Sequence, residues 1–380
     1  MTTSTDLLRR LVAFPTVSDT SNLALLDWVE ALLVPAGPRL RRFPNPDGTK
    51  ANLLASFGPE RPGGLLLSGH TDVVPVAGQS WSGDPWTLRE ADGRLTGRGA
   101  CDMKGFLACC LALAETLEGR RLERPVHLAL SYDEEVGCTG VGPMAEWAGS
   151  ALSPALAIIG EPSSMQLVNA HKGGLIGWAT VTGKTGHSSQ PDRGVDAVRV
   201  AAECIGRFTA LAATFRSGPI DPAFDPPWST TGVNVIEGGH GLNLIAESCR
   251  FFWEMRVLPG VDDQALFEEF QTKVEAELVP AMQAIDPACG VRFEVLARIP
   301  ALSAPSRGLE RRLLDLLGQA APRVVAYGSE AGIFQNAQIP SVIIGPGNIA
   351  QAHQPDEWIE AAQLAACNQV LDQLVTAFCN

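Results

Sequence analysis

The sequence predicts an α/β fold: a mostly parallel sheet flanked by helices, into which a smaller α+β domain is inserted. Three observations predict it. Short apolar runs alternate with helical patterns over about the first 170 residues, as in a parallel sheet whose strands are joined by helices. From Lys172 the pattern changes to strand, helix, strand, strand, helix, strand. Strand and helix alternation returns after residue 296, which indicates that the second pattern interrupts the first.

The first part of the chain begins with helices and continues with buried strands. Leu7, Leu8, Leu11 and Val12 recur at helical spacing before Pro15, and a second helical segment follows. Three later runs have the length and composition of buried strands, and a helical pattern, KGFLACCLALAETLEG, lies between the first two. These runs are GGLLLSGHTD, RPVHLALSYDEE and SPALAIIGEP.

The interrupting segment is typical of a split βαβ, ferredoxin-like domain. Its predicted strands include LIGWATVTGK, TTGVNVIEGG and ESCRFFWEMRV, and a long helical pattern runs from Asp262 to Gln283. A helix near Leu309 to Leu317, the run QIPSVIIGPG and a last helix from Glu360 complete the first domain. The predicted domains are residues 1–172 together with 297–380, and the insertion 173–296.

Charge and composition narrow the class of protein. The 380 residues carry 29 basic and 42 acidic side chains, a net charge of −13, so nucleic acid and anionic membranes are poor partners. The first residues lack the apolar core of a secretory signal, and no run of about 18 apolar residues follows, so we expect a cytoplasmic protein. Nine cysteines, with no C-x-x-C pair, predict buried thiols rather than disulfides or a thiolate zinc site.

Acids and histidines follow several of the predicted strands. Because parallel strands bring their carboxyl ends to one edge of a sheet, we expect these side chains to share one rim. Two imidazoles and several carboxylates are the ligand mixture that a pair of zinc ions requires. The residues are His70 and Asp72 in LLLSGHTD, Asp102 in GRGACDMKG, Glu134 and Glu135 in LALSYDEE, Glu161 in AIIGEP, and His353 in AQAHQPDEW.

Each of these residues also has a structural explanation. Asp72 is either a ligand or the carboxylate that orients His70, and we favour the second role. Asp102 either caps a helix or bridges two cations. Adjacent acids such as Glu134 and Glu135 are usually solvated at strand ends, but at a buried strand end they would repel unless a positive charge lies between them.

The motifs together resemble the dinuclear-zinc aminoacylase and carboxypeptidase family through nearly the whole chain. This resemblance implies two Zn²⁺ ions, with Co²⁺ as a possible substitute. It assigns His70 and Glu161 to one ion, Glu135 and His353 to the other, and Asp102 to both. The motifs are SGHTDVVPVAGQSWSGDPW, GRGACDMKG, SYDEEVGCTG, GEPSSM, NAHKGG, GHSSQPDRGVDA, YGSEAGIFQ and GPGNIAQAHQPDEWI.

The resemblance also implies the remaining catalytic roles. Glu134 would be the general base and acid, and Asp72 would orient His70. The insertion would be a lid that forms a homodimer, and His187 would act in its own or the partner's active site.

The activity implied is hydrolysis of N2-acetyl-L-ornithine to L-ornithine and acetate, a step of arginine biosynthesis, by a metal-bridging water that Glu134 activates. Arg256 is our candidate for binding the α-carboxylate, because a guanidinium binds carboxylates bidentately. Its alternative role is a charge on the strand surface. Asn234 is a second polar candidate, and we expect Glu330 to face the substrate's side-chain ammonium.

Two other functions remain open. The substrate could be another N-acyl amino acid, such as succinyl-diaminopimelate, acetylcitrulline or a dipeptide, because the metal site would be shared. Outside enzymes, the chain could be a metal-binding relative without turnover. The presence of Glu134 disfavours that alternative, because a protein without turnover needs no base beside the metals.

Overall fold

The computed structural model describes residues 2–380. The chain divides into two compact units. Unit 1 comprises Met1–Ala170, Leu302–Val324 and Ser329–Asn380, and unit 2 comprises His171–Ala301 and Val325–Gly328. The sequence-based expectation placed the insertion at residues 173–296.

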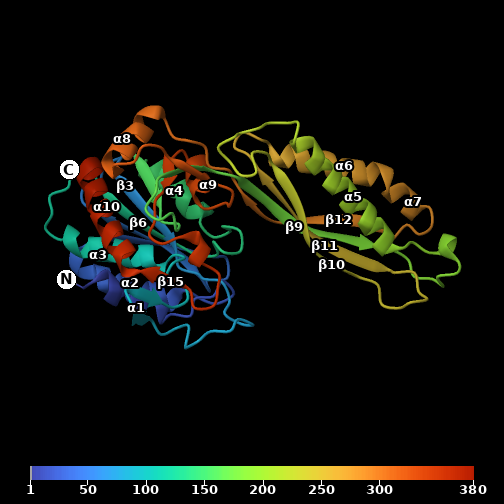
Figure 1. Cartoon of the computed structure of the whole chain (residues 1–380), viewed down its shortest axis with the longest axis horizontal. Coiled ribbons are helices and arrows are strands. Elements are labelled where there is room, and N and C mark those ends of the chain that lie inside the picture. The colour runs from blue at the N-terminus through green and yellow to red at the C-terminus, as the bar shows by residue number, and fades with distance from the viewer. Residues whose placement is uncertain (1) are drawn as a thin grey trace. The chain divides into compact units, whose positions relative to one another are not determined.

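Unit 1 is built around an eight-stranded sheet (Figure 1). In spatial order its strands are β1 (Arg39–Pro44), β2 (Ala51–Phe57), β6 (Val126–Ser131), β3 (Leu65–His70), β7 (Leu156–Ile159), β14 (Ser341–Ile343), β8 (Val168–His171) and β13 (Arg323–Val325). A smaller sheet contains β15 (Trp358–Glu360), β5 (Arg94–Thr96) and β4 (Arg89–Ala91). The helices are α1 (Ser4–Val12), α2 (Leu23–Leu33), α3 (Lys104–Leu117), α4 (Gly142–Ala151), α8 (Arg307–Leu317), α9 (Ala331–Asn336) and α10 (Ala361–Cys379), with short 3-10 turns η1 (Val34–Ala36) and η3 (Ile349–Gln351).

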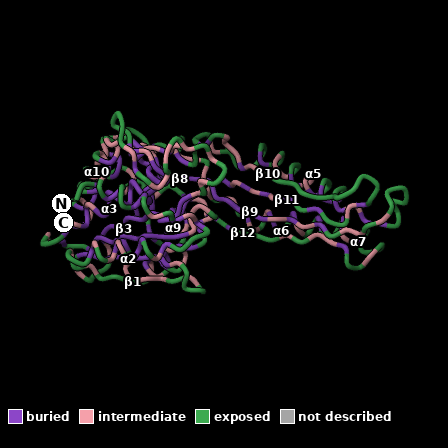
Figure 2. The backbone as a smooth tube through the Cα atoms, turned by 90° about the horizontal axis from the view of Figure 1, so that it is seen from below, coloured by how far each residue is buried: buried purple, intermediate pink, exposed green. Residues whose placement is uncertain are grey.

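The centre of this sheet is parallel and its margins are antiparallel. β6, β3, β7 and β14 run parallel to one another, whereas β1 with β2, β2 with β6, and β14 with β8 pair antiparallel. Every residue of β3, β6 and β7 is buried, and Figure 2 shows buried backbone, in purple, through the interior of unit 1. Because successive strand side chains point to opposite faces, both faces of the sheet must be covered. Helices α1, α3 and α10 pack together over β3, and α9 contacts α4, β7 and β14.

Unit 2 is a four-stranded antiparallel sheet with helices. Its elements are β9 (Gly173–Thr182), a 3-10 turn η2 (Pro191–Arg193), α5 (Ala197–Phe215), β10 (Thr230–Gly238), β11 (Ser248–Val257), α6 (Asp263–Glu277), α7 (Val279–Gln283) and β12 (Gly290–Ile299). The strand order is β10-β11-β9-β12. Alternate residues of β11 are buried, and Trp253 among them stacks on Phe267 of α6 with ring centroids 4.3 Å apart. One face of this sheet therefore holds the core of unit 2.

The predicted fold class, an α/β sheet with an inserted α+β unit, is confirmed. One long helix was expected from Asp262 to Gln283, but the structure divides it at Leu278 into α6 and α7. Pro280 lies in the first turn of α7, where its missing N–H costs nothing, whereas it would interrupt the interior of a continuous helix. All nine cysteines are buried and unpaired, as predicted. Between residues 2 and 380, no helix combines the length and the apolar character needed to cross a membrane.

His171, the last residue of β8, is a buried neutral imidazole. Its side chain is 0% exposed, and burial lowers its pKa to about 4. The ring Nδ1 lies 2.9 Å from the carbonyl oxygen of Lys172, so Nδ1 carries the proton. The other ring nitrogen has no hydrogen-bond partner, and protonation there would bury an unpaired charge.

The burial of His171 predicts a pH-dependent stability. Below its ordinary pKa of 6.5 the unfolded chain takes up a proton that the folded chain refuses until about pH 4, so the free energy of unfolding falls as the pH falls. The contribution is on the order of 3 kcal/mol across this window. His171→Phe should flatten the pH dependence, measured by urea unfolding, whereas the exposed control His240→Phe should not. Equal slopes for His171→Phe and the wild type would contradict this account.

Candidate metal centre

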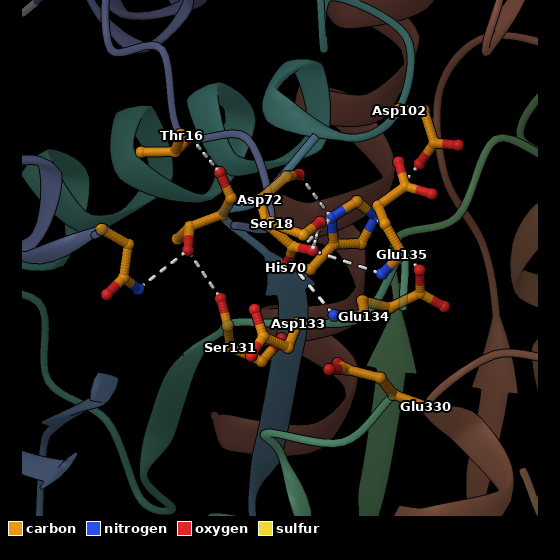
Figure 3. Close-up of polar contacts among 12 residues, drawn as sticks. Thr16, Ser18, His70, Asp72, Asp102, Ser131, Asp133, Glu134, Glu135 and Glu330 are labelled. Carbon is orange, nitrogen blue, oxygen red and sulfur yellow. Dashed lines mark hydrogen bonds and ion pairs between the residues drawn. The ribbon is translucent and has the colours of Figure 1, made fainter. Parts of the chain in front are cut away.

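The predicted rim exists at the carboxyl ends of the parallel strands (Figure 3). His70 is the last residue of β3, Glu134 and Glu135 follow β6, and Glu161 follows β7. These three strands are parallel neighbours, which is why residues distant in sequence end at the same edge. Asp102 reaches the same place from the turn that precedes α3.

His70 lies at the middle of one part of the cluster. Its Nε2 is 3.1 Å from Oδ1 of Asp102. The same nitrogen is 3.9 Å from Oε1 of Glu161 and 4.0 Å from Oε2 of Glu134. A 1% exposed imidazole therefore faces three carboxylates with one nitrogen.

His353 forms the other part. Its Nε2 is 3.0 Å from Oε2 of Glu135 and 3.4 Å from Oδ2 of Asp102. Asp102 thus presents one oxygen to each imidazole, which is the arrangement that a bridging carboxylate needs. His353 has a φ of 61°, a backbone conformation that is uncommon outside glycine and often occurs at functional sites.

Two sets of side chains lie close enough to hold a metal ion. His70, Asp102 and Glu135 form one set and His70, Glu134 and Glu161 the other, with the ligand atoms of each set within 4.8 Å of one another. The assignment taken from the family resemblance differs, because it places His353 with Glu135 and keeps Glu134 as a base. The division of ligands between two ions therefore stays a prediction.

The donor set fits a divalent cation. Oε1 of Glu135 and Oε1 of Glu161 are buried and have no hydrogen-bond partner. Imidazole and carboxylate groups are ordinary ligands of zinc and of related ions. A cation among these atoms would satisfy buried oxygens that the protein itself leaves unpaired.

The crowding of buried carboxylates also shifts their pKa values. Burial raises the pKa of Glu134 and of Glu161 well above the ordinary value, and the charge of Asp102 raises both further. Hydrogen bonds to Asp102 and Glu135 raise the pKa of His353 to about 10. Without a cation, protons supply the positive charge in this cluster, and metal binding must displace them.

Asp72 organises the neighbouring loop. Its carboxylate oxygens accept hydrogen bonds from the backbone N–H groups of Glu134 and Glu135, each at 3.2 Å, and from Oγ of Ser18 at 2.7 Å (Figure 3). Nδ1 of His70 lies 2.9 Å from the main-chain oxygen of Asp72 and 3.7 Å from its carboxylate. The main-chain oxygen is therefore the acceptor for His70, because the carboxylate is occupied by the loop that carries Glu134.

The sequence reasoning missed the buried pair Arg98 and Glu357. Oε1 of Glu357 accepts hydrogen bonds from the N–H groups of Cys101 at 2.8 Å and Asp102 at 3.0 Å. Oε2 accepts from the N–H of Gly99 at 3.0 Å and from Nη1 of Arg98 at 2.7 Å. The only signal in the sequence was the acidic pair beside His353 in HQPDEW. Glu357 fixes the turn that carries Asp102.

Glu330 belongs to unit 1 and lies near the cluster (Figure 3). It is 1% exposed, and Oγ of Ser68 is 3.5 Å from its Oε2. Burial raises its pKa to about 7, and its Oε1 has no hydrogen-bond partner. Glu330 is thus a deeply buried carboxyl group rather than a surface acid.

The other predicted substrate residues belong to unit 2. Nε and Nη2 of Arg256 lie 3.2 and 3.0 Å from Oε2 of Glu254, and Nδ2 of Asn234 lies 3.2 Å from Oε1. Both candidates therefore converge on one carboxylate, which the sequence reasoning did not consider. His187 is exposed, and its Nδ1 accepts a hydrogen bond from the N–H of Ser189 at 3.1 Å.

The contacts of Glu357 predict a role in metal affinity. Glu357→Gln replaces one acceptor oxygen by an NH₂ group that would face N–H donors, so the turn carrying Asp102 should shift. We expect the affinity for zinc, measured by competition with a chromogenic chelator, to fall about 10- to 100-fold. Glu360→Gln, a nearby exposed control, should retain the wild-type affinity. An unchanged affinity in Glu357→Gln would refute the role.

Comparisons with known proteins identify the family of the chain. The model of peptidase family M20/M25/M40 matches residues 66–377. An acetylornithine deacetylase of Yersinia pseudotuberculosis (strain IP 31758) is 37% identical over 387 residues, covering 98% of this chain and 97% of that protein. One from Photorhabdus laumondii is 35% identical with the same coverage.

Solved structures share the fold. An M20 family metallo-carboxypeptidase, Sso-CP2 from Sulfolobus solfataricus, superposes with a TM-score of 0.77 at 17% identity and covers 99% of each chain. Aminopeptidase PepT from Bacillus cereus gives a TM-score of 0.72 at 17% identity, covering 98% of this chain and 97% of the other. Since the family match and the sequence relatives extend over most of its length, the chain belongs to the peptidase family M20/M25/M40.

Proposed function

We propose that this chain is a zinc-dependent amidohydrolase that converts N2-acetyl-L-ornithine to L-ornithine and acetate, a step of arginine biosynthesis. Family membership and the ligand groups of unit 1 support a metal-dependent hydrolase. The observation that carries the proposal is the convergence of two imidazoles on Asp102, with Glu134 beside them. The substrate is suggested by the relatives named acetylornithine deacetylase.

In this proposal, His70 and Glu161 bind one ion, Glu135 and His353 bind the other, and Asp102 binds both. When bound, the ions supply Lewis-acid chemistry, since divalent cations polarise carbonyl groups and make water more acidic. Zinc suits these ligands, and cobalt is proposed as a substitute because carboxylates and imidazoles accept several divalent ions.

Glu134 is proposed as the group that moves the proton. Its side chain is 12% exposed, compared with 5% for Asp102 and 6% for Glu161, so it is the carboxylate most open to water and substrate. A carboxylate placed beside the reacting groups can both take a proton from water and return it. Glu134 accepts the proton of the attacking water and then delivers it to the leaving nitrogen. Asp72 holds the backbone of Glu134 in place.

The substrate's charged groups require complementary partners. Arg256 is proposed to bind the α-carboxylate, in which case the substrate must compete with Glu254 for the guanidinium. Asn234 contacts the same glutamate and is the second polar candidate. Glu330 is proposed to receive the side-chain ammonium, because Glu330 has an unpaired buried oxygen that an ammonium would satisfy.

We also propose that unit 2 is a lid that joins two subunits into a homodimer. His187 is exposed on unit 2, and its imidazole is proposed to act in the active site of its own or the partner subunit. There it would stabilise the negative charge that develops on the substrate carbonyl oxygen.

Replacing Glu134 should abolish turnover without removing the metal. Glu134→Gln keeps the shape of the side chain but cannot accept the proton of water, so kcat should fall about 10²- to 10⁴-fold. The metal content, measured by atomic emission, should stay at the wild-type level. The control Asp133→Asn removes the preceding carboxylate, which pairs with Lys50, and should lower kcat much less. Equal losses in the two variants would refute the role of Glu134.

A substrate panel tests the reaction. We expect kcat/KM for N2-acetyl-L-ornithine to exceed that for succinyl-diaminopimelate, acetylcitrulline and a dipeptide by about tenfold or more. A chelator should remove the activity, and added zinc or cobalt should restore it. Chelator-insensitive hydrolysis would exclude the metal mechanism, and a preference for succinyl-diaminopimelate would exclude the proposed substrate.

Glu330 tests how the substrate ammonium is recognised. Glu330→Gln should reduce the preference for N2-acetyl-L-ornithine over N-acetyl-L-norvaline, whose side chain is uncharged, by about tenfold or more, because a charge-assisted hydrogen bond is lost. The ratio of the two kcat/KM values measures this preference. Glu310→Gln, a partly buried glutamate that pairs with Asn169, is the control. An unchanged ratio in Glu330→Gln would show that the ammonium binds elsewhere.

A further inference from the structure

Unit 1 contains a hollow of about 460 Å³ beside the edge strand β1. β1 lies at the end of the eight-stranded sheet, and it runs along the margin of unit 1 in Figure 2. The walls come from β1, β2, the turn that follows β2, the start of β6 and the end of α4. None of the proposed metal ligands lines this hollow.

The hollow is positively charged although the chain is acidic. Arg39, Arg41 and Arg61 line it, together with a single acid, Glu60. Arg39 pairs with Glu60 at 3.2 Å and donates to the carbonyl of Gly58 at 2.9 Å. Among residues 2–380, neither Arg41 nor Arg61 has an ion-pair partner. In a chain with a net charge of −13, two unpaired guanidinium groups in one concavity favour an anionic ligand.

Aromatic packing holds one of these arginines in place. The guanidinium carbon of Arg41 lies 4.3 Å from the ring centroid of Trp147 and 5.4 Å from that of Phe43. Stacking covers the face of a guanidinium and leaves the N–H groups at its edge free. Arg41 is therefore positioned to donate to an oxyanion rather than to sample many rotamers.

The floor of the hollow contains a buried hydrogen-bonding group without a partner. His127, on β6, is 1% exposed and lines the hollow, and its Nδ1 is 2.8 Å from Oγ of Ser56. Its Nε2 is buried and has no hydrogen-bond partner. Burial, aided by the charge of Arg39, lowers the pKa of His127 to about 4. When the hydroxyl of Ser56 donates to Nδ1, the neutral ring carries its proton on Nε2.

Such an unpaired buried donor is rare in folded proteins, and it is normally satisfied by a ligand or an ordered water. The hollow is also within the size range of small-molecule sites and is larger than a single phosphate or carboxylate group requires. Three prolines, Pro59, Pro62 and Pro125, supply apolar surface for a carbon skeleton.

We propose that this hollow is a binding site for a small organic anion, whose phosphate or carboxylate oxygens are held by Arg41 and Arg61 at the rim and by Nε2 of His127 at the floor. The site is separate from the metal centre and does not depend on the reaction proposed above. Charge-assisted hydrogen bonds from two guanidinium groups would supply most of the affinity.

Calorimetric titration of the metal-loaded full chain tests the site with two probes, adenosine monophosphate and succinate, which distinguish a phosphate from a carboxylate ligand. At least one probe should bind. The double variant Arg41→Ala, Arg61→Ala should weaken that binding about tenfold or more, while amide hydrolysis without the probe stays at the wild-type rate. Arg10→Ala, which removes an exposed arginine elsewhere in unit 1, should bind the probe as the wild type does.

A second variant addresses the floor. His127→Phe keeps a buried ring but lacks the donor, so it should weaken the same probe while the rim arginines remain. Thermal unfolding shows whether His127→Phe is folded. If it is not, the double arginine variant, which changes only exposed residues, tests the proposed site. Failure of both probes to bind would overturn the proposal. Wild-type affinity in the double arginine variant would also overturn it, since the probe would then bind elsewhere.

Discussion

The repulsion among buried carboxylates is the constraint on which the candidate active site depends. The side chains of Asp102, Glu134, Glu135 and Glu161 are only 5 to 12% exposed to water, so the Coulomb energies among them are larger than at a surface. Protons relieve this repulsion in the absence of a cation, which is why burial and mutual charge raise the pKa values of Glu134 and Glu161. A divalent cation relieves it more completely, because it neutralises several carboxylates at once. The cluster is therefore suited to bind a divalent cation.

The rest of unit 1 serves to hold these charges together. The parallel strands β3, β6 and β7 bring their carboxyl ends to one edge, and packing on both faces leaves those strands little freedom. Two further carboxylates, Asp72 and Glu357, bind backbone N–H groups of the turns that carry Glu134 and Asp102. Their charges orient the backbone of these turns, so a second layer of hydrogen bonds holds the candidate ligands in place.

Most of the fold could be predicted from the sequence because it is encoded locally. Continuous apolar runs indicated buried parallel strands, and the change of pattern near Lys172 indicated the inserted unit. The division between α6 and α7 at Leu278 was missed because the hydrophobic pattern continues past it, whereas Pro280 disfavours one continuous helix. The gathering of the candidate ligands at one rim could be predicted for a similar reason, whereas their roles were taken from the family resemblance. Each follows a recognisable strand or turn, and parallel strands end at one edge.

The sequence by itself determined the fold class and the chemical character of the rim, since both follow from periodicity and from the residue types at strand ends. Only the tertiary structure decided which atoms meet. It showed that the main-chain oxygen of Asp72 faces His70, that Glu357 anchors the Asp102 turn, and that Glu254 faces both Arg256 and Asn234. Some of these contacts depend on the exact course of the backbone, and others join residues that are as many as 255 positions apart in the sequence. No local sequence pattern encodes such contacts.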